Sequence, residues 1–135
     1  MKRLCAAILS ICILLTFSAC SVEKIGTEKI RDIDFTVIKE EDIPEELKTK
    51  INDNEKQVFK LTYADQGALY IAEGYGEQPT SGYSIEVKDC FETKNAIYVH
   101  TNLIGPSNEE KIVEAKTYPY IVIKMEFMDK NVVFQ

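Results

Sequence analysis

Residues 77–85, Glu-Gln-Pro-Thr-Ser-Gly-Tyr-Ser-Ile, form a conformationally restricted turn near the middle of a chain of 135 residues. Pro79 fixes its own φ and pushes the residue before it toward an extended conformation, while Gly82 can adopt a positive φ without steric cost. Apolar and polar residues alternate from Tyr83 to Lys88, which is the pattern of a half-buried antiparallel strand. The stretch therefore predicts a defined loop that leads directly into a strand.

Runs of strand-type residues lie on both sides of this loop. Before it, the period of two begins near Val58, and residues 64–67, Ala-Asp-Gln-Gly, predict a turn into a second strand at 68–73. The Gly-Tyr-Gly of residues 74–76 is expected to be flexible. Further strands are expected at 33–38, from 83 through 91, through 97–99 after a turn at 94–95, at 111–115, at 120–127 and at 132–134.

A single amphipathic helix is predicted before these strands. Asp42 is a capping-type residue and Pro44 suits the first helical turn. Ile43, Leu47 and Ile51 recur every four residues and form one apolar stripe, which is expected to cover one face or end of a sheet. The sequence thus predicts a mainly β (α+β) fold, a small antiparallel β-sandwich or partly open barrel with one N-terminal helix and about seven short strands.

The start of the chain has the organisation of a secretory signal peptide. Lys2 and Arg3 precede an apolar run, residues 4–15, that is shorter than a membrane-spanning helix requires. Ser18 and Ala19 then precede Cys20, an arrangement that resembles the lipobox of bacterial lipoproteins, in which the thiol receives a diacylglyceryl group. Phe17 departs from that pattern, because Leu is usual at this position.

Three segments follow from this resemblance. We expect a lipoprotein signal peptide at 1–19, a lipid-anchored tether at 20–31 that begins with lipidated Cys20, and a β-domain at 32–135. The protein is then expected at the extracytoplasmic face of the cell membrane, held there by the lipid.

Charge and cysteine content exclude several classes of protein. The chain has a formal net charge of −6, and loss of Lys2 and Arg3 with the signal peptide makes it more acidic. An acidic surface repels phosphates and anionic headgroups, so neither nucleic-acid binding nor electrostatic membrane docking is expected. Processing also leaves Cys90 as the one cysteine besides lipidated Cys20, so no intrachain disulfide is expected, and Cys90 has the character of a small buried hydrophobe.

The residues offer little chemistry. The single histidine, His100, has no cysteine or acid at metal-ligand spacing and lies at an outward type of position on a predicted strand. No nucleophile-elbow sequence is present, and the acidic pairs Glu40-Glu41, Glu45-Glu46 and Glu109-Glu110 lie in helix starts or loops, where solvated charge is the usual explanation. We expect no enzyme activity, no metal and no cofactor.

Two motifs resemble one known family. The Pro-Thr-Ser-Gly-Tyr of residues 79–83 resembles the Pro-Thr-Gly-Gly-Tyr signature of the PrcB C-terminal domain family, named for a subunit of a bacterial surface protease complex. Residues 117–123, Thr-Tyr-Pro-Tyr-Ile-Val-Ile, look like the Tyr-Pro-Tyr strand that closes such domains, so the resemblance covers roughly residues 65 to 127. It implies a non-catalytic accessory or regulatory protein that binds an exported protease or another envelope protein. The expected contact residues are Pro79, Thr80, Ser81, Gly82 and Tyr83.

Two alternatives remain open. The loop is also similar to the Asn-Pro-Thr-Thr-Gly-Tyr loop of chagasin-type cysteine-protease inhibitors, although Gln78 and Ser81 depart from it and the chain has no tryptophan for that family's Arg-Pro-Trp loop. The other alternative is a tethered module for a small envelope ligand or polysaccharide. It would use tyrosines as stacking surfaces: Tyr70, Tyr75, Tyr83, Tyr98 and Tyr118.

Overall fold

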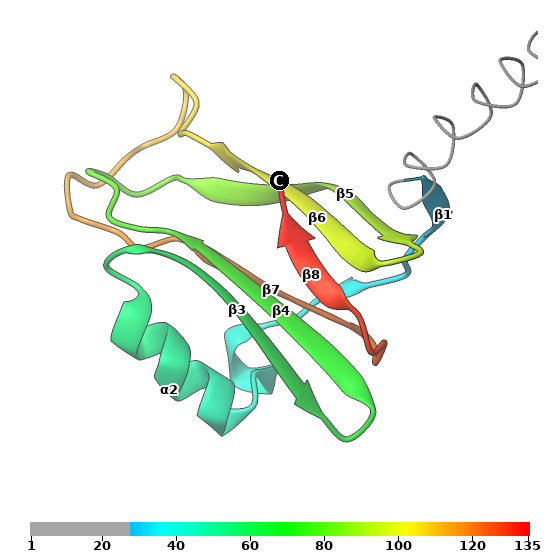
Figure 1. The fold of residues 1–135 in the computed structure, drawn as a ribbon. Coiled ribbons are helices and arrows are strands. Elements are labelled where there is room, and N and C mark those ends of the chain that lie inside the picture. Colours follow the sequence, from blue (N-terminus) through cyan, green and yellow to red (C-terminus); the bar gives the residue numbers. More distant parts are fainter. Residues whose placement is uncertain (1–27) are drawn as a thin grey trace, which may run out of the picture.

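The computed structural model describes residues 28–135 as two stacked four-stranded sheets with a helix packed on the outside of one of them (Figure 1). One sheet has the strand order β1-β5-β6-β8 and the other the order β2-β7-β4-β3. The elements are β1 (Lys29–Asp32), β2 (Thr36–Val37), the 3-10 turn η2 (Glu40–Asp42), α2 (Glu45–Asn54), β3 (Val58–Asp65), β4 (Ala68–Tyr75), β5 (Ser84–Thr93), β6 (Ala96–Ile104), β7 (Tyr120–Glu126) and β8 (Asn131–Phe134).

The fold confirms the expected mainly β class, and of the two expected shapes it is the sandwich, since neither sheet closes into a barrel. Among the described strands, all pairs are antiparallel except β6 and β8, which run parallel. Within residues 28–135 eight strands form, against about seven expected. The expected strand at 33–38 is replaced by β1 and β2, which belong to different sheets, and the strand expected at 111–115 does not form.

The chain changes sheets between β1 and β2. Asp32 pairs with Phe91 of β5, whereas Thr36 pairs with Lys124 of β7 in the other sheet. Ile33, which lies between them, is buried in the core and donates its backbone N–H to the carbonyl of Cys90. Because β1 begins at Lys29, the sheet also starts three residues before the domain boundary expected at residue 32. The expected signal peptide, residues 1–19, and lipidated Cys20 lie outside the described residues.

Two apolar layers hold the three-layer arrangement together. Between the sheets, β4 contributes Leu69 and Ile71, which share a face as expected, against Ile97 and Val99 of β6. The other face of β4 packs Ala68, Tyr70 and Ala72 under α2. Burial on both faces explains why the apolar run of β4 is nearly continuous.

Helix α2 confirms the predicted stripe but begins later than predicted. Ile43, Leu47 and Ile51 are at most 5% exposed and pack on the outer face of the β4 sheet. Asp42 belongs to the 3-10 turn, and Pro44 occupies the N-cap position, where no side chain caps the helix. The prediction of Asp42 as the capping residue was therefore wrong.

Two residues of the Gly-Tyr-Gly connection, Gly74 and Tyr75, are the last residues of β4, whereas Gly76 follows the strand. Gly74 pairs with both Phe59 and Tyr120. A methyl group added at Gly74 would lie only 2.1 Å from Cε1 of Phe59, so this glycine makes room for the phenylalanine ring. The pairing fixes the direction of the backbone at the end of β4, where the loop at 76–83 begins.

Candidate functional site

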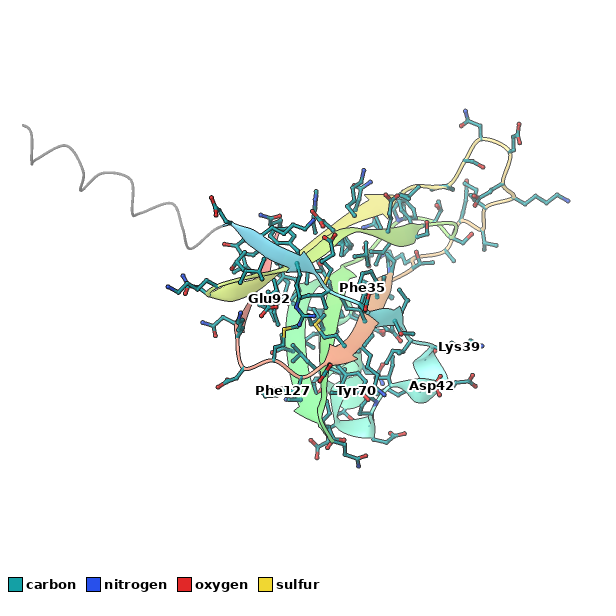
Figure 2. All side chains as sticks on the ribbon, turned by 90° about the vertical axis from the view of Figure 1, so that its right-hand side faces the viewer. Phe35, Lys39, Asp42, Tyr70, Glu92 and Phe127 are labelled. Carbon is teal, nitrogen blue, oxygen red and sulfur yellow. The ribbon has the colours of Figure 1, made fainter. Side chains whose placement is uncertain are left out.

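The predicted loop lies at one end of the sandwich, beyond the last residues of β4 and β6 and the first residues of β5 and β7 (Figure 1). Gly76 has a φ of +75° and Gly82 a φ of +90°, so the positive φ predicted for Gly82 is confirmed. The end of β1 beside Lys29 lies at the opposite end of its sheet, next to the β5–β6 turn. Figure 2, seen from that side, also separates β1 from the loop end.

A second segment, residues 105–119, covers the loop and is called the strap here. Gln78 and Thr117 exchange two backbone hydrogen bonds, of 2.8 and 3.0 Å, and Thr117 Oγ1 also donates to the carbonyl of Thr80 at 2.7 Å. Ser81 donates its N–H to the carbonyl of Val113 at 3.0 Å, while its Oγ accepts the N–H of Val113 at 2.8 Å. The loop is therefore bound along most of its length to a segment that follows it by more than thirty residues.

The strap replaces the strand that the sequence predicted at 111–115. Residues 111–116 contain no strand. Their neighbour is an irregular loop, and the hydrogen bonds between the two run through one loop residue, Ser81. Val113 uses its carbonyl a second time, as the acceptor for the N–H of Ala115 at 2.9 Å. The strap is thus held to the loop by isolated hydrogen bonds, and not by the continuous series of hydrogen bonds that joins two strands of a sheet.

The five predicted contact residues divide into two groups. Pro79 and Gly82 are exposed. Thr80, Ser81 and Tyr83 are half-buried. The hydroxyls of Thr80 and Ser81 already bond within the site, since Thr80 Oγ1 donates to the carbonyl of Ser81 and Ser81 Oγ accepts from Val113. Tyr83 lies beside Gly105 of the strap.

Sequence reasoning missed the apolar side chains that the strap exposes. Val113 is 63% exposed and Ile112 is 44% exposed, and Ile104, at the end of β6, is 40% exposed. The strand expected at 111–115 led to their interpretation as sheet residues. The available signal was the absence of period-two alternation, because Ile112 and Val113 are adjacent apolar residues between charged ones.

The same end of the molecule carries mostly acidic side chains. Glu109, Glu110 and Glu114 are exposed on the strap, together with Lys111 and Lys116. Lys116 lies 3.6 Å from the carboxylate of Glu77 in the loop, which also accepts a 3.4 Å hydrogen bond from Tyr118. The loop and the strap, which include the exposed aliphatic pair, therefore carry four exposed carboxylates and two exposed ammonium groups.

A polar chain in the interior supports the base of the loop. Thr101 Oγ1 of β6 donates to the buried carboxylate of Glu73 at 2.8 Å, and the hydroxyl of Tyr75 lies 2.5 Å from the same Thr101 oxygen. Because the single hydroxyl proton of Thr101 goes to Glu73, the Tyr75 hydroxyl is the donor in the second bond. These side-chain hydrogen bonds link β4 to β6 across the sandwich, immediately before the loop begins.

His100 and Cys90 are the two side chains within residues 28–135 whose chemistry the sequence analysis considered individually. His100 is half-buried on β6, and no group of three or more potential metal ligands occurs within residues 28–135. Burial, with a smaller contribution from the nearby charge of Asp89, raises the pKa of the Cys90 thiol to about 11. At neutral pH this thiol is protonated and is a poor nucleophile.

The tyrosines named for a stacking surface do not collect in one hollow. Tyr70 is buried, and the other four are half-buried. One groove, of about 960 Å³, lies where the chain changes sheets and is lined by side chains such as Phe35, Asp42 and Met128, and by none of these tyrosines. Figure 2 shows this face of the molecule, with Phe35 and Asp42 labelled. Tyr118 lines a smaller groove, of about 360 Å³, beside Tyr120.

No helix within the described part of the chain is long and apolar enough to cross a membrane.

Comparison with known proteins gives one match. Residues 69–126 match the family model described as PrcB C-terminal. This confirms the resemblance that the Pro79–Tyr83 and Thr117–Ile123 motifs carried, and the matched range extends from β4 to β7 and includes both the loop and the strap. No curated protein and no solved structure matches the chain.

Proposed function

With residues 69–126 matching the PrcB C-terminal family, we propose that the protein is a non-catalytic accessory subunit that binds an exported protease and stabilises or regulates it. The contact surface is the loop end of the sandwich. In this proposal, lipidated Cys20 anchors the protein to the extracytoplasmic face of the membrane.

One observation carries the proposal: the loop is ordered by the rest of the domain without having a catalytic group in it. The strap bonds to Gln78, Thr80 and Ser81, and the glycine at 82 is held in a conformation that few other residues adopt. A surface that is ordered before binding loses little conformational entropy when a partner docks. Such order favours recognition of a macromolecule with a fixed shape.

The position of the loop supports the same function. The described chain begins at β1, at the opposite end of the sandwich from the loop (Figure 1). A lipid attached before β1 would hold that end near the membrane and would leave the loop and the strap directed away from it. The geometry suits a partner that approaches from the aqueous side.

The experiment compares the lipidated wild type with two substituted proteins in envelope extracts. Pro79→Arg places a long cation at the exposed position of the loop, whereas Asp129→Lys changes an exposed residue in the β7–β8 turn at the other end. We expect wild type and Asp129→Lys to recover the same exported protease, whose abundance or activity falls when the protein is deleted. Pro79→Arg should recover less of it and should fail to restore the protease.

The proposal is overturned if wild type recovers no exported protease, or if protease abundance and activity are the same with and without the protein. Thermal unfolding of all three proteins provides the control for folding. Recovery of a soluble glycan in place of a protein would instead favour the alternative of a ligand-binding module.

A further inference from the structure

We infer that Ile112 and Val113 of the strap are the anchor of the docking surface, and that the partner offers them an apolar pocket with a basic rim. The inference rests on the proposed function and names the partner's chemistry. It moves the main contact from the Pro79–Tyr83 loop to the strap.

Backbone hydrogen bonds hold Val113, the more exposed residue of the pair, in place. Val113 is fixed at both its N–H and its carbonyl by Ser81, at 2.8 and 3.0 Å, and its carbonyl also accepts from Ala115. The Val113 side chain is nevertheless 63% exposed, and Ile112 is 44% exposed. When a partner covers an exposed apolar side chain, removal of its surface from water lowers the free energy of the complex.

The order also lowers the cost of binding. β-Branched side chains have few rotamers to lose, and the backbone N–H and carbonyl of Val113 already have hydrogen-bonding partners. Small clusters of ordered apolar groups inside a polar rim are the usual centre of a protein interface. Ile112 and Val113 have this arrangement, with Ile104 at the same end of the sandwich.

The charged residues of the loop and the strap indicate which charge the partner carries around its apolar pocket. The loop and the strap carry four exposed carboxylates, those of Glu77, Glu109, Glu110 and Glu114, against the two exposed ammonium groups of Lys111 and Lys116. Lys116 is in addition paired with Glu77 at 3.6 Å. Complementary potential therefore requires Lys or Arg side chains around the pocket that receives the strap.

Ser81 acts in this scheme as a positioning residue. Its Oγ accepts the N–H of Val113, so Ser81→Ala removes that acceptor and leaves the Ile112 and Val113 side chains unchanged. We expect faster hydrogen exchange at the Val113 amide and weaker binding in Ser81→Ala, and near wild-type behaviour in Ser81→Thr, which retains the hydroxyl. A purely structural role elsewhere in the domain would not produce exchange confined to the strap.

The decisive titration uses the purified protease from the extract experiment. Val113→Asp should weaken its binding at least about tenfold, because it places a charge at the centre of the contact. Ile30→Asp is the matched control, since Ile30 is 60% exposed on β1, at the opposite end of the sandwich from the loop. Glu109→Lys with Glu114→Lys should also weaken binding, and affinity should fall as salt is added, whereas Asp129→Lys should match wild type.

Two designed peptides test the chemistry without the natural partner. One alternates Lys and Leu, and the other alternates Glu and Leu. The Lys–Leu peptide should shift the amide signals of residues 109–116 in the full protein more than the Glu–Leu peptide does, and Val113→Asp should reduce the shifts.

The outcomes separate this inference from the proposed function. If the protease binds wild type and Val113→Asp equally, the strap is not the anchor, although the accessory function stands. If charge reversal at Glu109 and Glu114 strengthens binding, the partner's rim is acidic and the inference is wrong. If no protease is recovered, the accessory function fails, and equal or absent shifts with the two peptides then overturn the inference as well.

Discussion

At the scale of the residue, Gly82 shows how one position fixes the loop. Its φ of +90° lies in the region that side chains with a Cβ avoid, and a Cβ built there would be 2.7 Å from Cβ of Pro106 and 3.0 Å from Oε2 of Glu110. Gly67, in the β3–β4 turn, has a similar φ of +77° but nothing within 4 Å of its added Cβ. An alanine at Gly67 would meet only backbone strain, whereas an alanine at Gly82 would meet both backbone strain and a steric clash.

We predict that Gly82→Ala lowers the free energy of unfolding by about 3 kcal/mol, from left-handed strain together with overpacking against the strap. Gly67→Ala should cost only about 1 kcal/mol, from the strain alone. Urea unfolding of both proteins measures the difference. Equal losses would mean that the strap moves aside at no cost and that it is not packed on the loop.

At the scale of the element, an ion-pair clasp attaches β1 to the rest of its sheet. Glu92 of β5 accepts Arg31 Nε of β1 at 2.7 Å and Lys130 Nζ of the β7–β8 turn at 2.5 Å. Lys130 also donates to the carbonyl of Thr93 at 2.8 Å. Hydrogen bonds from Lys130 and then Arg31 hold the pKa of the Glu92 carboxyl below its ordinary value.

The clasp predicts a dependence of stability on pH. Since the folded-state pKa of Glu92 is lowered, its stabilising contribution is complete above the ordinary Glu pKa of about 4.3 and is lost as pH falls through the folded value. We expect Glu92→Gln to lower the melting temperature at pH 7. The difference in melting temperature from wild type should disappear below about pH 4.

The matched control for the clasp is Glu86→Gln, also on β5. Glu86 has only the exposed Lys88 as a partner, at 3.8 Å, and pairs of this kind contribute little. Its melting temperature should follow wild type at both pH values. A Glu92→Gln protein that melts like Glu86→Gln throughout would show that the clasp does not stabilise β1.

At the scale of the whole molecule, the two ends of the sandwich have different roles in our proposal. β1 marks the end nearest the tether, and the loop and strap mark the end that receives the partner (Figure 1). The interior chain from Tyr75 through Thr101 to Glu73 supports the partner end across both sheets. The arrangement requires an anchor before β1 for the loop end to be directed away from a membrane.

We predict that Cys20 is this anchor. Cys20→Ser should abolish labelling with radioactive fatty acid and should release the protein from membranes or stall its processing, because stable attachment needs the acyl chains. Cys12→Ser, a change within the expected signal peptide, should retain both labelling and membrane attachment. An unlabelled and fully soluble wild type would contradict the prediction.

The sequence by itself determined the features that depend on near neighbours. The apolar stripe of Ile43, Leu47 and Ile51 gave the helix, and the alternation after Tyr83 gave β5. The hairpin turn formed at Gln66 and Gly67, both with positive φ, as Ala-Asp-Gln-Gly predicted. These signals are readable because helix period, strand period and the sterics of glycine act over a few residues.

Only the tertiary structure decided which distant segments meet. Nothing local to residues 33–35 indicates that the chain changes sheets there, and nothing local to Gly74 reveals the ring of Phe59 above it. The strap shows the same limit, because Val113 is held outward by Ser81, 32 positions earlier. The backbone N–H and C=O groups of an extended segment outside a sheet bond to the segment that the fold places beside it. The exposure of its side chains therefore depends on that neighbour and not on its own sequence.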